Sequence, residues 1–154
     1  MSNSTAALDR FLAGLPDFDT LSAQDRQALV MALELRSHPA GHQIIDQGDR
    51  GDGAYFLLSG TVRVQLEQDG EIKVLGTMEP GALVGVLAMV DHRPRSASCV
   101  AQTDIEVAFL SRPAFEMLAH RHASIAYPFQ RAVGAQIARD FRQAVGRLRD
   151  HLQP

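Results

Sequence analysis

The chain has 154 residues, of which 45% are hydrophobic and 21% charged, a composition typical of one globular domain that needs no disulfide or metal to fold. Its formal net charge of −3 gives no general attraction to nucleic acid or to an anionic membrane. The single cysteine, Cys99, excludes an intrachain disulfide, and we expect it to be a buried small hydrophobic residue in a protein of a reducing compartment.

The N-terminal segment, MSNSTAALDRFLAGL, lacks both the basic n-region and the long apolar h-region of a signal peptide. Elsewhere no run approaches the ~20 apolar residues that a membrane span needs. We therefore expect a cytoplasmic protein that does not contact a membrane.

The first region, about residues 6–35, is predicted to be helical. Large apolar side chains recur there at three- and four-residue spacing, at Leu8, Phe11, Leu12 and Leu15. Pro16 interrupts this run, and Ser22 is a suitable N-cap for the second helix, SAQDRQALVMALEL.

The central region, about residues 38–111, has the pattern of short strands. Alternating or apolar runs follow one another: HQIID, AYFLLS, TVRVQLEQ, EIKVLGTM, SCVAQ and EVAFLS. The segments GDRGDG, DG and EPG divide them as turns, and we expect Asp49 and Asp52 to cap backbone groups there. Many short strands at this spacing predict a barrel or a double-sheet roll.

The last region, about residues 112–152, returns to helical periodicity. Ser111 followed by Pro113 predicts the start of a short helix that ends at Leu118, and a long helix is expected from near Pro128. No repeat or low-complexity linker divides the chain, so residues 1–154 are predicted to form one domain.

One segment inside the strand region, GVLAMV at residues 85–90, is predicted to be a single helical turn. The first backbone N–H groups of such a turn have no partner within the helix. Arg95 and Ser96 follow, and no carboxylate lies between Val86 and Met89. Backbone donors, a positive helix end and a guanidinium together form a site for an anion such as phosphate. The alternative is that Arg95 is a solvated loop residue.

Two segments together resemble a known family. HQIIDQGDRGDGAYFLLSGTVRV followed by LVGVLAMVDHRPRSA resembles the cyclic-nucleotide-binding domain of regulators of the catabolite-activator and fumarate-nitrate type, and the resemblance covers roughly residues 8–152. It implies an α+β fold: a double-stranded β-helix, or jelly-roll barrel, with N-terminal helices and a long C-terminal dimerisation helix.

The resemblance also implies a ligand site for a cyclic nucleotide, cyclic AMP or cyclic GMP, and no other cofactor. The phosphate subsite of the family, an arginine with a hydroxyl neighbour and a turn with free N–H groups, corresponds to Arg95, Ser96, Gly85, Leu87 and Ala88. The wall under the ribose and the base corresponds to Val64, Leu75 and Gly76.

One position departs from the family pattern. Where the family has a glutamate that accepts a hydrogen bond from the ribose 2′-hydroxyl, this chain has Val86. A buried hydroxyl without its partner costs about 1–3 kcal/mol, or roughly 5- to 150-fold in affinity. We therefore expect weak or no cyclic AMP binding, and we expect Val86→Glu to raise that affinity. If another residue holds the ribose, Arg139 and Gln143 on the terminal helix are the first candidates.

A second interpretation is a metal-dependent enzyme of the cupin type, because the barrel class permits one and the chain has six histidines. The candidate ligands are His42, His92, His120 and His122. The H-x-H pair lies at a helix end after the barrel, with no carboxylate following nearby, so we expect neither a metal site nor enzymatic activity.

The terminal helix has a long apolar stripe, formed by Val133, Ile137, Phe141, Val145, Leu148 and Leu152. Because the stripe extends further than a small barrel can cover, we expect a homodimer whose seam contains the first five of these residues, and a glutamate at Phe141 to give monomers. Gly134 and Gly146 cost about 1 kcal/mol each relative to alanine, which is tolerable where they allow close approach of another helix.

The arginines of this helix alternate with aspartates, which is typical of a solvated face. In the resembled regulators a helix-turn-helix domain follows, whereas this sequence stops two residues after Leu152. We therefore expect no direct DNA binding, unless the sequence is a fragment.

The leading hypothesis is a cytoplasmic homodimeric sensor that binds a small phosphate-bearing ligand and signals by repositioning its terminal helix to an unidentified protein partner. The alternatives are a diverged dimeric interaction module that binds no nucleotide, and the cupin-like enzyme.

Overall fold

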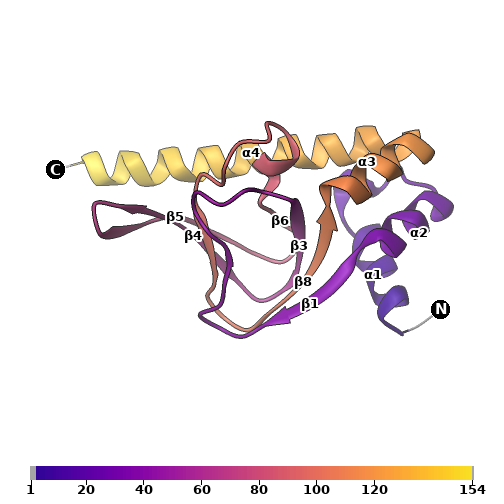
Figure 1. The fold of residues 1–154 in the computed structure, drawn as a ribbon, viewed down its shortest axis with the longest axis horizontal. Helices are drawn as coiled ribbons and strands as arrows, with labels where there is room; N and C mark the ends of the chain where they lie inside the picture. Colours follow the sequence, from indigo (N-terminus) through magenta and orange to yellow (C-terminus); the bar gives the residue numbers. More distant parts are fainter. Residues whose placement is uncertain (1–2, 154) are drawn as a thin grey trace.

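The chain folds into two antiparallel sheets with helices before and after them (Figure 1). The computed structural model describes residues 3–153. The N-terminal elements are α1 (Asn3–Ala13), the 3-10 helix η1 (Pro16–Phe18) and α2 (Ala23–Ala32). The strands are β1 (Glu34–His38), β2 (Gln43–Ile45), β3 (Gly53–Ser59), β4 (Val62–Gln68), β5 (Glu71–Met78), β6 (Leu83–Val84), β7 (Ser98–Ala101) and β8 (Ile105–Ser111). The 3-10 helix η2 (Val86–Met89) lies between β6 and β7, and α3 (Arg112–Arg121) and α4 (Ala123–Leu152) follow β8.

Each sheet has four strands, in the orders β1-β8-β3-β6 and β2-β7-β4-β5. Successive strands alternate between the two sheets except at the β4–β5 hairpin. This hairpin turns at Asp69 and Gly70, whose φ angles of 53° and 77° are those of a type I′ turn. The predicted strand-rich roll is therefore confirmed, and its sheets are consistent with a jelly roll.

The central strands are buried on both faces, because the roll has an apolar interior and the helices cover one of its sheets. In β3, Tyr55 and Leu57 belong to the core inside the roll, whereas Phe56 belongs to the core beneath the helices. β8 alternates in the same way, with Val107 inside and Ala108 under the helices. A strand covered on both faces has a nearly continuous apolar sequence, which explains the runs AYFLL and VAFL.

The strand β1 differs from the prediction of a helix through residue 35. The predicted N-cap of α2 is confirmed, since Ser22 Oγ accepts a hydrogen bond from the Asp25 N–H at 3.0 Å. The helix ends at Ala32, however, and residues 34–38 pair with β8 from Glu34 opposite Phe109 onward. Pairing at a sheet edge outweighs the helix propensity of MALEL, which amounts to a few tenths of a kcal/mol per residue.

The C-terminal helices start and end differently from the prediction. The Ser111 cap is confirmed, since its Oγ accepts from the Ala114 N–H at 3.2 Å, but α3 continues past Leu118 to Arg121. The start predicted near Pro128 is wrong: α4 begins at Ala123 and contains Pro128. A proline inside a helix costs about 3 kcal/mol. Burial of Ile125 in the helical core offsets this cost and holds the first turn in place.

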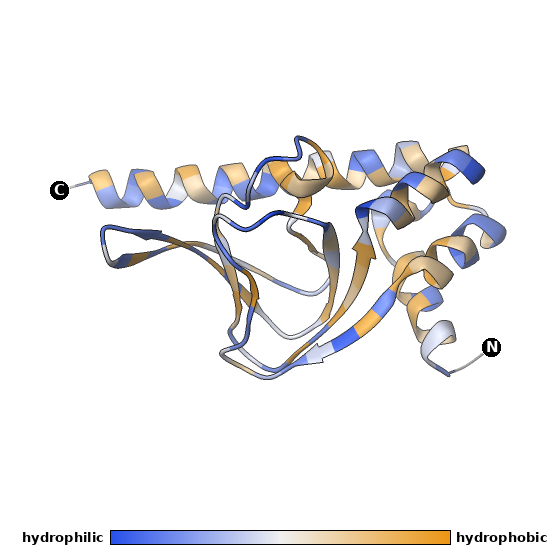
Figure 2. Ribbon diagram, in the orientation of Figure 1, coloured by the Kyte–Doolittle hydropathy of each residue, from blue (hydrophilic) through white to orange (hydrophobic). Residues whose placement is uncertain are grey.

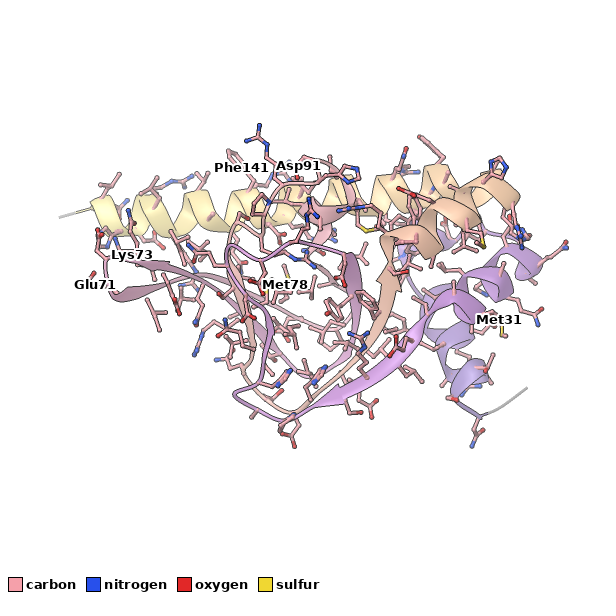
Figure 3. The ribbon with its side chains drawn as sticks, viewed as in Figure 1. Met31, Glu71, Lys73, Met78, Asp91 and Phe141 are labelled. Carbon is pink, nitrogen blue, oxygen red and sulfur yellow. The ribbon has the colours of Figure 1, made fainter. Side chains whose placement is uncertain are left out.

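The helix α4 runs along the whole molecule, and its C-terminal half extends over the β4–β5 hairpin (Figure 1). Figure 3 shows Glu71 and Lys73 at the far end of this hairpin, beneath the helix. Apolar residues continue along α4 to its C-terminal end (Figure 2). Although α4 has 30 residues, no helix within residues 3–153 is long and apolar enough to cross a membrane.

Phe129 of α4 lies at the centre of the helical core, and it supplies a test of how that core holds α4 in place. Its ring is 1% exposed and contacts Phe18, Phe56 and Phe115, with ring centroids 6.3, 6.3 and 4.5 Å away. Phe129→Ala is expected to lower the free energy of unfolding by about 3–5 kcal/mol, because it leaves a cavity among the other rings.

Urea denaturation followed by circular dichroism measures this change. Tyr127→Ala is the control, since Tyr127 lies on the same helix but is 69% exposed, and its effect should be within about 0.5 kcal/mol. Equal effects of the two substitutions would contradict the placement of α4 on this core.

Candidate functional site

Arg95 lies in the loop between η2 and β7, and backbone hydrogen bonds fix this loop against the turn that precedes β3. The Arg95 N–H donates to the Asp49 carbonyl at 2.7 Å, and the Gly48 N–H donates to the Arg95 carbonyl at 2.8 Å. We expected the side chains of Asp49 and Asp52 to cap this turn, and this expectation is wrong: among the hydrogen bonds of residues 3–153, the two residues take part through their backbone. The turn therefore positions Arg95 through its main chain.

The Arg95 guanidinium is half-buried and is held by two carbonyl groups. Its Nη1 donates to the Gly85 carbonyl and its Nη2 to the Gly53 carbonyl, both at 2.8 Å. Burial lowers the pKa of Arg95, and no carboxylate within residues 3–153 forms an ion pair with it. Since a guanidinium has five N–H donors, three remain for another acceptor. The alternative of a fully solvated Arg95 is wrong, because this side chain is partly buried and ordered by the protein.

Two glycines are required for this arrangement. Gly85 is the N-cap of η2, with a left-handed φ of 80°, and a Cβ there would lie 2.6 Å from Arg95 Nη1. A Cβ at Gly51 would lie 2.3 Å from the Cβ of Ala88. Any larger residue at these positions would displace either the η2 turn or the arginine.

A second arginine, Arg112 at the start of α3, holds the same turn from its other side. Its Nη2 donates to the Gly51 carbonyl at 3.0 Å and its Nε to the Ala88 carbonyl at 3.1 Å, with a further bond from Nη2 to Ala88. This role could not be predicted from the sequence, since the segment SRPAF indicates only a helix start. Two guanidinium groups therefore flank η2, and the proximity of Arg112 contributes to lowering the pKa of Arg95.

Two adjacent cavities lie between the η2–β7 segment, the second sheet and α4. The inner cavity, about 80 Å³, has a lining that includes Arg95, Ser96, Gly85, Val86, Ala88 and Cys99. The outer cavity, about 290 Å³, has a lining that includes Leu75, Gly76, Phe141 and Gln143. Both are lined by Val64, Leu87, Ser96, Ala97 and Asp140. All nine residues of the predicted ligand site thus line one of these cavities or both, and their contact with a ligand stays a prediction.

Val86 lines the inner cavity but is also buried in the helical core. Its side chain is only 3% exposed. A glutamate at this position would have to leave that core to reach the cavity, where Asp140 already lies.

The middle of α4 forms one wall of both cavities, and the sequence predicts this only in part. Gln143, a candidate in the sequence, lies so close to β5 that a Cβ at Gly76 would lie 2.0 Å from its Oε1. Arg139 lines neither cavity. Asp140 was missed, although an acidic residue beside Ile137 and Phe141 in an apolar stripe is an available signal.

Cys99 and the histidines give no support to a catalytic site. Burial raises the pKa of Cys99 to about 12, so its thiol is protonated at neutral pH, as expected for a buried residue. Within residues 3–153 no three histidine, cysteine, aspartate or glutamate side chains gather as a metal site would require. His42 instead stacks on His38, with ring centroids 4.2 Å apart.

The sequence of the chain is similar to that of known regulatory proteins. Over 111 residues the chain is 39% identical to the type II regulatory subunit of the cAMP-dependent protein kinase of Drosophila melanogaster, covering 71% of this chain and 29% of that relative. The chain thus spans less than a third of the length of that relative.

Solved structures agree on the fold. A cyclic nucleotide-binding domain from Methylobacillus flagellatus has a TM-score of 0.84 at 24% identity, with 97% of this chain and 85% of that chain covered. The catabolite activator protein of Thermus thermophilus has a TM-score of 0.70 at 31% identity, with 86% and 61% covered.

The family model of the cyclic nucleotide-binding domain matches residues 35–122, which include β2 to α3, the η2 turn and Arg95. This match covers more than half of the 154 residues and confirms the resemblance found in the sequence. The chain therefore belongs to the cyclic nucleotide-binding domain family.

Proposed function

We propose that this domain binds a small phosphate-bearing ligand, a cyclic nucleotide, through Arg95, Ser96 and the η2 turn. The observation that carries the proposal is the half-buried guanidinium of Arg95, which binds two carbonyl oxygens but has no carboxylate partner within residues 3–153. A buried cation without a counter-charge is costly, and an anion from outside the protein removes that cost. Phosphate suits the planar donors of a guanidinium best.

The proposed role is regulatory and not enzymatic. The chain is related to regulatory subunits of the cAMP-dependent protein kinase, and the relative in Drosophila melanogaster carries cyclic AMP in its name. We therefore propose cyclic AMP or cyclic GMP as the ligand of this chain. A cytoplasmic location and the absence of direct DNA binding stay predictions, the latter supported by the net charge of −3.

The proposed output is a movement of α4. This helix lines both cavities through Asp140 and the outer one through Phe141 and Gln143, so a ligand there touches it directly. Beyond the cavities, α4 continues over the β4–β5 hairpin, where a partner can contact it (Figure 1). If the ligand binds more tightly when α4 is in one position than in another, ligand binding shifts the population of molecules toward that position.

We also propose that two copies associate through the outer part of α4. Phe141, Leu148 and Leu152 are 68%, 58% and 72% exposed. Large apolar side chains that are exposed together on one surface mark a site of protein–protein contact. Val133 is buried in the chain's own core and Ile137 packs against it, so Val133 is removed from the predicted seam. A Cβ at Gly134 or Gly146 would meet nothing within 4 Å in one copy, so a close approach there would have to come from a second copy.

The binding proposal predicts a specific loss for Arg95→Ala. Titration calorimetry with cyclic AMP and cyclic GMP should show at least about tenfold weaker binding per charge-assisted hydrogen bond removed. The affinity of Arg95→Lys should lie between those of the unchanged protein and Arg95→Ala, because an ammonium keeps the charge without the planar fork.

Arg147→Ala is the matched control, since Arg147 is an exposed arginine of α4 that lines neither cavity. It should bind like the unchanged protein. If the unchanged protein binds no cyclic nucleotide, the alternative of a nucleotide-non-binding interaction module is supported instead.

The association proposal predicts that Leu148→Glu gives monomers, because a charge buried in the seam would have no partner. Light scattering after size-exclusion chromatography at tens of micromolar measures the mass. Phe141→Glu should act in the same way, but Phe141 also lines the outer cavity, so Leu148 is the cleaner position.

Gln130→Glu, which adds the same charge at an exposed position of α4, is the control and should leave the dimer intact. A monomeric mass for the unchanged protein would contradict the proposal.

A further inference from the structure

Asp140 is the one residue of α4 that lines the inner cavity. It also lines the outer cavity and a third cavity of about 650 Å³, which lies between η1, the β5–β6 turn and α4. Its side chain is partly buried. One carboxylate therefore lines all three cavities.

The hydrogen bonds of Gln136 fix one oxygen of this carboxylate. Gln136 is 3% exposed, and its Nε2 donates to Asp140 Oδ1 at 2.8 Å. Gln136 Oε1 accepts from the Leu83 N–H at 3.1 Å and from Arg139 Nη2 at 2.9 Å. The glutamine is thus anchored to the strand β6 and cannot turn away, so Asp140 is held in one orientation.

The second oxygen, Asp140 Oδ2, has no hydrogen bond to any of residues 3–153, and no arginine, lysine or histidine among them forms an ion pair with this carboxylate. Burial raises the pKa of Asp140, as expected for a carboxylate taken partly out of water. The chemical complement of such a group is an O–H or N–H donor of a bound molecule. An ionised phosphate offers only acceptors, so it would bind the donors of Arg95 and not the carboxylate of Asp140.

We propose that Asp140 determines the ligand specificity of this site by accepting a hydrogen bond from the sugar 2′-hydroxyl of the molecule whose phosphate Arg95 binds. This inference rests on the proposed function. In a 3′,5′-cyclic nucleotide the free hydroxyl lies on the carbon next to the one that carries the phosphate ester. Asp140 shares the small inner cavity with Arg95, whereas the outer cavity, with Leu75, Gly76 and Gln143, has room for the base.

The same geometry changes the expectation for Val86. Val86 and Asp140 line one cavity of about 80 Å³, so Val86→Glu would bring two carboxylates close together. Like charges at short range raise the cost of ionising both. A glutamate at position 86 should therefore help only after the carboxylate of Asp140 has been removed.

The experiment compares cyclic AMP with its 2′-deoxy analogue by titration calorimetry. The unchanged protein should bind cyclic AMP more tightly than the analogue by about tenfold, the worth of one hydrogen bond to a charged group. Asp140→Ala should weaken cyclic AMP binding and bind the two probes within about twofold of each other. Asp140→Asn can only donate to the hydroxyl from its Nδ2, so it should show a smaller preference for cyclic AMP than the unchanged protein. Thermal melting monitors the fold, and Asn retains the bond from Gln136.

A double substitution tests the placement of the acceptor. Val86→Glu alone should gain no affinity for cyclic AMP, whereas Val86→Glu in the Asp140→Ala background should restore the preference for cyclic AMP over the analogue. A gain for Val86→Glu alone that equals its gain in the Asp140→Ala background would overturn the inference.

The remaining outcomes separate this inference from the proposed function. Equal binding of both probes by the unchanged protein, with loss of binding in Arg95→Ala, overturns the role of Asp140 and leaves phosphate binding intact. A change at Asp140 that alters the ratio of cyclic GMP to cyclic AMP but not the effect of the 2′-hydroxyl overturns it in favour of base recognition. No binding of either probe overturns the proposed function and this inference together.

Discussion

The contact on which the site depends is the pair of hydrogen bonds from the Arg95 guanidinium to the carbonyls of Gly85 and Gly53. These bonds join the η2 turn to the start of β3, two segments that are far apart in the sequence. They satisfy part of a buried cation with dipoles instead of with a carboxylate. Arg112 repeats this solution on the other side of the turn, with the carbonyls of Ala88 and Gly51. Within residues 3–153 neither of these two guanidinium groups forms an ion pair, which leaves positive charge around η2 available to an anion.

The helix α4 combines three functions that follow one another along its length. Its first part, around Phe129, belongs to the helical core and fixes the helix to the fold. Its middle, around Asp140, is the wall of the cavities, and its last part, with Leu148, is exposed. Gln136 lies at the border between the first two parts and bonds the helix to Leu83 of β6. Any shift of the middle of α4 therefore changes the buried hydrogen bonds of Gln136 as well as the walls of the cavities.

The sequence predicts those features that depend on local chemistry. Ser22 and Ser111 are caps because their hydroxyls accept from N–H groups three residues ahead, and the η2 turn follows from its own composition. β1 and the first turn of α4 could not be predicted, because pairing with β8 and burial of Ile125 come from distant parts of the chain. Arg112 was missed for the same reason, whereas Asp140 had only the weak local signal of an acidic residue beside an apolar stripe. Each is an ordinary helix residue until the fold brings it against η2 or the inner cavity.

The position of a hydroxyl acceptor on α4 has a consequence that an acceptor on the η2 turn would lack. With a glutamate at position 86, both polar contacts of a nucleotide would lie within one turn of the β-roll. On the proposed roles of Arg95 and Asp140, the phosphate contact would lie on the roll and the hydroxyl contact on the helix. The ligand would then connect the η2–β7 segment with α4. The free energy of ligand binding would then depend on the position of α4. By linkage, the position of α4 would depend on whether the ligand is bound. An acceptor at Asp140 would thus place the recognition of the sugar on the element through which the signal is proposed to leave.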